Sequence, residues 1–235
     1  VQDLCHEEPK RSWDEDLTEK GQSEVERCMK SLKKLPQIRI PRCYIQAEFG
    51  EPVKTELHSF CDASSVAYGS NVYLRRVNDC GAVCTSLVMA KSRMNPRRTA
   101  LTIPRAELCS AVLATRIVRI VLEELELNVD RIVYWTDSMS NLRYISNTSK
   151  RYQVFVHHRV SEIQTESNIA DWRYVPTSLN PSDLLTRPNY LKEEDNVNTK
   201  CFWFHGPPFL NENEIEWPRQ SGDDREVRDD DPEVL

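Results

Sequence analysis

The sequence predicts an α/β fold in which antiparallel hairpin strands are followed by parallel strands in one mixed sheet, with helices on both faces. Two observations predict it. Residues 55–90 are rich in Val, Tyr, Thr and Ser and contain the turn sequence Asn78-Asp79-Cys80-Gly81 between two apolar runs, which is typical of a β-hairpin. After residue 100, long segments of helical period alternate with short apolar segments of strand length. Such an alternation favours a sheet that is covered by helices.

The elements after the hairpin follow from their boundaries. The segment that begins at Pro104 has no internal Gly or Pro for 24 residues, and a proline suits the first turn of a helix. Asn180-Pro181 gives the last helix a similar opening. The predicted elements are a helix at 104–127, a strand at 131–135, a helix from about 138 to 146, a helix at 152–166, a strand at 172–175 and a short helix that opens at Asn180-Pro181-Ser182-Asp183.

Composition divides the chain into four regions. Residues 1–50 are predicted to be a helical lead-in that ends in a connector, because the prolines of 35–42 stop helices and favour extended chain. Residues 51–190 hold the α/β domain, and residues 191–220 are predicted to be a linker. Residues 221–235 carry seven acids and two arginines, a composition that predicts an acidic, disordered tail.

Charge and cysteine content exclude several classes of protein. The net charge of -6 lies mainly at the ends, since residues 51–190 contain 17 basic and 14 acidic side chains. No apolar run reaches the roughly 20 residues of a membrane helix, so we expect no contact with a membrane. The eight cysteines show no CxxC pair, which argues against a zinc module and favours free thiols.

Four acids occupy strand or helix ends and are candidate metal ligands. They are Asp62, Glu107, Asp137 and Asp183. Carboxylates that share a cleft repel one another and raise each other's pKa unless cations neutralise them. Oxygen ligands without Cys or His favour Mg²⁺, or Mn²⁺, over zinc. If the four acids meet in one cleft, a pair of such ions could activate water and stabilise the leaving oxygen in phosphodiester cleavage, although their spacing in the sequence does not show that they meet.

The phrases around these acids resemble the ribonuclease H domain of BEL/Pao-type LTR retrotransposon polyproteins. They are Ala90-Lys91-Ser92-Arg93, Leu101-Thr102-Ile103-Pro104-Arg105-Ala106-Glu107-Leu108, Phe155-Val156-His157-His158-Arg159-Val160 and Asn180-Pro181-Ser182-Asp183-Leu184-Leu185-Thr186-Arg187. Outside the nuclease, residues 35–42 resemble the connection from the reverse transcriptase, and residues 202–210 with Trp217-Pro218 resemble the stretch that leads to integrase. The resemblance covers most of the chain except the acidic tail. The absence of an initiator Met also indicates a segment of a longer polyprotein.

The resemblance implies a fold, an activity and a role for each acid. The fold is ribonuclease H-like, and the activity is hydrolysis of the RNA strand of RNA/DNA hybrids with two Mg²⁺ ions, which leaves a 3′-hydroxyl and a 5′-phosphate. Asp62 would bridge both ions, Asp183 would complete the site of the water-activating ion, and Glu107 and Asp137 would hold the other. In one departure from the cellular enzymes, no histidine lies in the short loop of residues 177–180.

The resemblance also implies partners and a location. The partners would be an RNA/DNA hybrid and the reverse transcriptase and integrase regions of the same polyprotein. The location would be a cytoplasmic retrotransposon particle, with the nucleus as an alternative. A hybrid-specific nuclease reads groove shape and 2′-hydroxyls, so small polar and basic residues near the acids are candidates for nucleic-acid binding. These candidates are Ser64, Arg93, Ser138, Asn141 and Arg159.

Three other functions were weighed against this one. An integrase-type strand transferase would need a later acid, for which Glu162 and Glu166 are candidates without a matching motif, and Glu107 would then have no role. An aspartic peptidase is excluded by the absence of Asp-Thr-Gly and Asp-Ser-Gly triplets. A catalytically silent module that binds nucleic acid or braces the polymerase, from a degenerate or host-retained element, stays open as the alternative.

Overall fold

A computed structural model describes residues 14–33, 35–44, 47–96, 101–187, 202–219, 226–227 and 230–235. Parts of the predicted lead-in, linker and tail, residues 1–13, 191–201 and 220–225 among them, lie outside the described residues. The chain separates into two units, with the division between Arg42 and Cys43. The first unit contains helix α1 (Glu19–Leu32), and the second contains the sheet.

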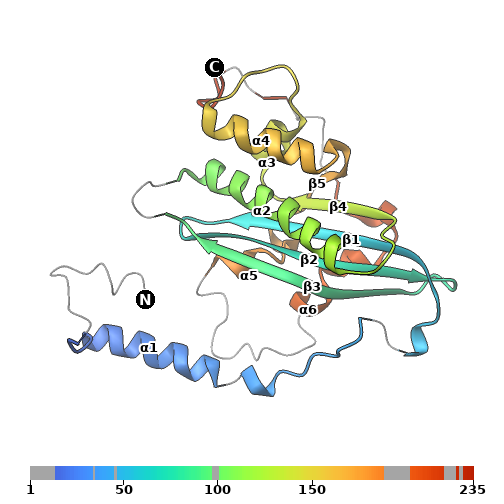
Figure 1. Ribbon diagram of the computed structural model, residues 1–235, viewed down its shortest axis with the longest axis horizontal. Coiled ribbons are helices and arrows are strands. Elements are labelled where there is room, and N and C mark those ends of the chain that lie inside the picture. The colour runs from blue at the N-terminus through green and yellow to red at the C-terminus, as the bar shows by residue number, and fades with distance from the viewer. Residues whose placement is uncertain are drawn as a thin grey trace. The chain divides into compact units, whose positions relative to one another are not determined.

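The second unit is built on one five-stranded sheet in the order β3-β2-β1-β4-β5 (Figure 1). The strands are β1 (Pro52–Ala63), β2 (Ala67–Asn78), β3 (Val83–Met94), β4 (Arg131–Thr136) and β5 (Trp172–Tyr174). The first three pair antiparallel, whereas β4 pairs parallel with β1 and with β5. The predicted mixed sheet, with hairpin strands before parallel strands, is confirmed.

The two turns of the meander are closed by polar side chains. At the predicted turn, Asn78 Oδ1 accepts a hydrogen bond of 2.7 Å from the Ala82 amide, and Gly81 has a φ of +80°, which favours glycine. The turn between β1 and β2 contains neither Gly nor Pro. There the Ser64 hydroxyl accepts from the amides of Val66 and Ala67, so that one side chain replaces the usual turn residues.

Helices cover both faces of this sheet (Figure 1). The helices of the second unit are α2 (Ile103–Glu124), α3 (Met139–Ser146), α4 (Val154–Glu166), α5 (Asp183–Thr186) and α6 (Phe202–His205). Pro104 lies in the first turn of α2, as predicted. Asn180-Pro181-Ser182 forms the approach to α5 rather than its first turn, because residues 177–179 already make a separate 3₁₀ turn.

Two apolar cores lie on opposite faces of the sheet. One packs α2, α3 and α4 against residues such as Leu57, Cys61 and Val72. The other contains Phe60 and Trp135 and is covered by the C-terminal segment 202–219. β1 is buried on both faces from Thr55 to Ala63, and it carries buried polar side chains such as Glu56, His58 and Ser59 among the apolar ones.

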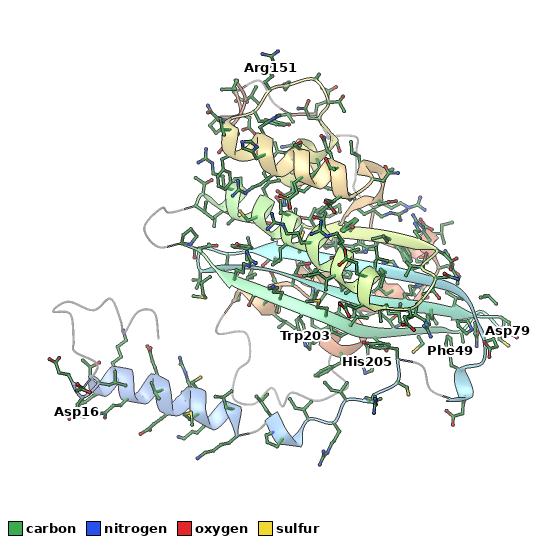
Figure 2. The ribbon with its side chains drawn as sticks, viewed as in Figure 1. Asp16, Phe49, Asp79, Arg151, Trp203 and His205 are labelled. Carbon is green, nitrogen blue, oxygen red and sulfur yellow. The ribbon has the colours of Figure 1, made fainter. Side chains whose placement is uncertain are left out.

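The segment 202–219, which the sequence places in a linker, packs on the sheet. Phe209, Leu210 and Trp217 are buried in the second core, and the Tyr73 hydroxyl donates to the Trp203 carbonyl over 2.8 Å (Figure 2 labels Trp203). Arg75 donates to the carbonyls of Leu210 and Glu212 over 2.6 and 3.1 Å. This segment therefore covers one face of the sheet, as α2, α3 and α4 cover the other.

None of the helices among the described residues combines the length and the apolar composition that crossing a bilayer requires.

Candidate metal centre

Three of the four predicted acids come together at one edge of the sheet. Asp62 lies near the end of β1, Asp137 follows β4 directly, and Asp183 begins α5. Cys61 pairs with Thr136 across the parallel strands, which places Asp62 and Asp137 side by side. One carboxylate oxygen from each of the three acids lies within 4.8 Å of the others. A separation of 121 positions in sequence thus becomes a single cluster.

Glu107 lies beside this cluster but outside the 4.8 Å group. It sits in the first turns of α2, after the proline at the helix start. Burial, together with the charges on Asp62, Asp137 and Asp183, raises the pKa of Glu107 to about 9. The four acids therefore form one electrostatic unit, although only three of them share the tight cluster.

The repulsion also reaches the three clustered acids. Burial raises the pKa of Asp62 to about 7, with the charges on Asp137 and Asp183 adding to the shift and a hydrogen bond from Thr186 opposing it. The pKa of Asp183 is raised by burial, although Arg187, whose guanidinium lies 3.3 Å from Asp183 Oδ1, lowers it. Raised pKa values of this kind mean that the ionised site lacks enough positive charge.

Two buried polar side chains hold the acids in place. The Thr186 hydroxyl donates to Asp62 Oδ2, and Asn180 Nδ2 donates to the Cys61 carbonyl over 3.0 Å and to Asp137 Oδ1 over 3.3 Å. The sequence analysis did not single out either residue. The only feature of the sequence that points to them is their spacing from Asp183. Thr186 lies three residues after Asp183, and Asn180 lies three residues before it.

These observations fit a divalent cation. The donor set is made of carboxylate oxygens, which are the ligands that Mg²⁺ and Mn²⁺ prefer. Among the described residues, Glu107 Oε2 is buried and has no hydrogen-bond partner. A buried carboxylate oxygen without a donor is costly, and a cation would satisfy it and lower the pKa of its neighbours.

Replacing Thr186 by Val is expected to weaken Mg²⁺ binding by roughly 10- to 100-fold, the usual effect of removing a hydrogen bond to a ligating side chain. Valine keeps the shape of the side chain and removes only the hydroxyl that orients Asp62. Isothermal titration with Mg²⁺ measures the effect. Thr177→Val is the control, since Thr177 is exposed in the preceding 3₁₀ turn and should bind Mg²⁺ like the wild type. Equal affinities for the two variants would contradict a role for Thr186.

Without metal, thermal stability is expected to fall as the pH rises from about 4 to 9. The unfolded chain releases the protons of Asp62 and Glu107 near their ordinary pKa values, whereas the folded state keeps them up to a pKa of about 7 and about 9, so that raising the pH over this range favours the unfolded state. Mg²⁺ binding requires the ionised acids, so the stabilisation by Mg²⁺ should grow over the same range. Melting curves of the wild type and Glu107→Gln, with and without Mg²⁺, measure both effects. The prediction fails if the two metal-free proteins show the same slope.

Three of the predicted nucleic-acid contacts lie beside the cluster and make internal hydrogen bonds. The Ser64 hydroxyl donates to the Thr186 carbonyl over 2.8 Å, which joins the end of β1 to α5. Ser138 caps α3, where its hydroxyl accepts from the Asn141 amide. Asn141 Nδ2 donates to the Glu107 carbonyl over 2.9 Å. These bonds tie together the elements that carry the acids, and direct contact with nucleic acid stays a prediction.

The other two candidates, Arg93 and Arg159, line a cavity of about 250 Å³ between β2, β3, α2 and α4. Arg159 stacks on the Phe155 ring, 3.4 Å from its centre, and donates to Cys109 Sγ over 3.2 Å. The cavity also contains Arg116 and His158, so its rim is mainly basic. The structure places both arginines in one surface feature but does not bring them into the acid cluster.

The two acids that an integrase-type reaction would need are engaged elsewhere. Glu162 accepts two hydrogen bonds of 2.6 and 2.9 Å from Arg116, and Glu166 accepts one of 3.1 Å from Arg119. Both pairs join α4 to α2 on the outer surface. Neither acid belongs to the metal-ligand group found among the described residues.

Comparison with curated proteins gave no match. Among solved structures, ribonuclease H1 from the archaeon Halobacterium salinarum is 17% identical, with 55% of this chain and 93% of that chain covered and a TM-score of 0.35. LC11-RNase H1 in complex with an RNA/DNA hybrid is 12% identical, with 56% and 93% covered and a TM-score of 0.37. The foamy viral protease-reverse transcriptase in complex with double-stranded DNA is 12% identical, with 69% and 27% covered and a TM-score of 0.32.

A family model describes more than half of the sequence. The model of the Pao retrotransposon-like RNaseH-like domain matches residues 1–138, a stretch that includes Asp62, Glu107 and Asp137 and ends before Asp183. The resemblance found in the sequence is thereby confirmed. This chain belongs to the Pao retrotransposon-like RNaseH-like domain family.

Proposed function

We propose that this domain hydrolyses the RNA strand of RNA/DNA hybrids during reverse transcription of a BEL/Pao-type retrotransposon. The observation that carries the proposal is the convergence of Asp62, Asp137 and Asp183 within 4.8 Å, with Glu107 coupled to them electrostatically, in an RNaseH-like domain. Raised pKa values at Asp62, Glu107 and Asp183 and an unpartnered buried oxygen suit cation-dependent phosphodiester cleavage.

Each residue of the site would have a role that follows from its position. Asp62, Glu107, Asp137 and Asp183 would hold two Mg²⁺ ions, or Mn²⁺, which supply an activated water and neutralise charge on the phosphodiester. Asp62 has the central place, since it is the most buried of the three clustered acids and Thr186 orients its carboxylate. Asn180 would fix Asp137 relative to β1 through its bonds to both elements.

The same proposal covers the context of the domain. Residues 1–50 would connect it to a reverse transcriptase, and residues 191–220 would lead toward an integrase while their part 202–219 also covers the sheet. The place of action would be a cytoplasmic retrotransposon particle, with the nucleus as an alternative. Cleavage by the domain alone and by the domain together with its polymerase would show whether its activity depends on that partner.

The experiment uses the full chain and Asp62→Asn. Each is incubated with a labelled RNA/DNA hybrid, double-stranded RNA or double-stranded DNA, in Mg²⁺, in Mn²⁺ or in EDTA. We expect only the RNA strand of the hybrid to be cut, only with a divalent metal, and not by the variant.

Other outcomes point to other functions. Cutting of double-stranded DNA would contradict hybrid specificity. If a folded wild-type chain binds the hybrid but cuts no substrate in any metal, and adding the polymerase region in trans restores nothing, the silent binding module is the correct function.

A further inference from the structure

The acidic C-terminal segment, which is described at residues 226–227 and 230–235, binds to Arg105 of α2 and Tyr144 of α3. The Glu233 carboxylate accepts two hydrogen bonds from Arg105, over 2.6 Å from Nε and 2.9 Å from Nη2. The Tyr144 hydroxyl lies 3.0 and 3.1 Å from the two carboxylate oxygens of Asp231, to which it donates. The sequence predicts a disordered tail here, and the difference arises because these acids find cationic and hydroxyl partners that composition does not reveal.

The backbone and an apolar side chain fix the segment further. The Gln153 amide donates to the Glu233 carbonyl over 2.8 Å, and the Leu235 amide donates to the Arg151 carbonyl over 2.9 Å, at the loop where Figure 2 labels Arg151. Val227 is only 5% exposed and belongs to the core around α2, α3 and α4. Glu233 itself is 7% exposed, so the segment covers what it binds.

The anchors lie on the two helices that start at the metal centre. Arg105 is two residues before Glu107 in the first turn of α2, and Tyr144 lies on α3, which follows Asp137. The bond from Asn141 to the Glu107 carbonyl holds these two helix ends together. The segment is therefore bound both to the helix that carries Glu107 and to the helix that follows Asp137.

The chemistry of the anchors is not specific for a carboxylate. A guanidinium fork donates two parallel hydrogen bonds to a carboxylate or to a phosphate with the same geometry. A tyrosine hydroxyl donates to a phosphate oxygen as it does to Asp231. The ring of Phe155, which Arg105 and Arg159 both approach, to 5.0 and 3.4 Å, keeps the Arg105 fork in position.

We propose that this acidic segment is an internal competitor of the nucleic acid, in which Asp231 and Glu233 occupy the places on Tyr144 and Arg105 that backbone phosphates take when a hybrid binds. The proposal rests on the proposed function, because it names what that substrate must displace. The competition reduces the apparent affinity for the hybrid by the fraction of molecules in which the segment is released. A segment that is bound ten times more often than it is free lowers the affinity about tenfold.

The test compares two full-length variants of equal charge. Asp231→Asn/Glu233→Gln weakens the segment, and Glu51→Gln/Glu126→Gln removes two exposed carboxylates elsewhere. Binding of a fluorescent RNA/DNA hybrid is measured by anisotropy in EDTA at fixed ionic strength. We expect roughly tenfold tighter binding for the first variant, and less than about twofold for the control. Adding Arg105→Gln to the first variant should remove the gain, since the phosphate would lose its partner.

Equal affinities for the two variants would overturn the proposal. Should the first variant fold poorly, hydrogen exchange of the wild-type chain replaces it: exchange of the Leu235 amide should speed up when the hybrid is added, and unchanged or slower exchange would overturn the competition. Because binding is measured without metal, the result is independent of cleavage. A chain that cuts hybrids but shows no competition keeps the proposed function and loses only this inference.

Discussion

Glu107→Gln is expected to lower cleavage of the RNA/DNA hybrid by roughly a thousandfold while the metal-free protein is more stable than the wild type near pH 7, because the unfolded wild-type chain is favoured by ionisation of Glu107 and glutamine does not ionise. Glutamine has the size of a protonated glutamate, and the pKa of about 9 means that Glu107 is protonated there without metal. The loss comes from removing one ligand of a cation that contributes several kcal/mol to the transition state, where about 4 kcal/mol corresponds to a thousandfold.

The matched control is Glu162→Gln on α4. Glu162 would be the third acid of an integrase-type site, but it pairs with Arg116 on a partly exposed surface. Its replacement should leave cleavage nearly unchanged and cost at most about 1 kcal/mol of stability. Single-turnover cleavage and melting curves with and without Mg²⁺ measure both variants. A large loss of activity for Glu162→Gln, with Glu107→Gln active, would reverse the assignment of the site.

Arg75→Met is expected to destabilise the fold by about 3 kcal/mol, the lower end of the cost of removing one partner of a buried ion pair, because Lys54 still lies 2.8 Å from Glu56. Arg75 is buried on β2, and its Nη1 lies 2.6 Å from Oε2 of the fully buried Glu56 on β1. Burial raises the pKa of Glu56, but hydrogen bonds to His58 and Lys54 outweigh it and hold the pKa well below the ordinary value, so Glu56 stays charged. The variant also loses the bonds to the carbonyls of Leu210 and Glu212, which attach segment 202–219.

Two further variants make this prediction specific. Arg173→Met breaks a partly exposed pair with Glu214 and should cost at most about 1 kcal/mol. Glu56→Gln/Arg75→Met removes both buried charges and should recover much of the stability that Arg75→Met loses. Urea unfolding followed by tryptophan fluorescence measures all three. If Arg75→Met costs no more than Arg173→Met, the buried pair does not hold the segment to the sheet.

Local signals determined most of the sheet and helices. The apolar runs on either side of the Asn78-Asp79-Cys80-Gly81 turn and the helical period after Pro104 are properties of neighbouring residues, and each predicted element appears within a few residues of its place. The turn at Ser64 was the exception, because it contains no Gly or Pro and is stabilised by the Ser64 hydroxyl, which accepts hydrogen bonds from the amides of Val66 and Ala67. Such a bond cannot be predicted from the residue types alone.

The candidate acids could be selected from the sequence, but their meeting could not be derived from spacing. Residues 62, 137 and 183 approach one another because parallel strands β1 and β4 end at one edge and α5 returns to it. The family resemblance identified the four candidate acids, and the tertiary structure showed how close their carboxylates lie to one another. The same pairing brought in Thr186 and Asn180, whose roles depend on side-chain contacts across 124 and 43 positions.

By itself, the sequence determined the order and type of the elements, the family and the four acids, because these depend on local periodicity and on recognisable phrases. Only the tertiary structure decided what the two polar-looking C-terminal segments do. Residues 202–219 bury Phe209, Leu210 and Trp217 against the sheet, and Glu233 binds Arg105 across 128 positions. Composition predicts that such segments are solvated, because it shows how many charges they carry but not which residues those charges contact. The contacts form only when the fold brings the partners together.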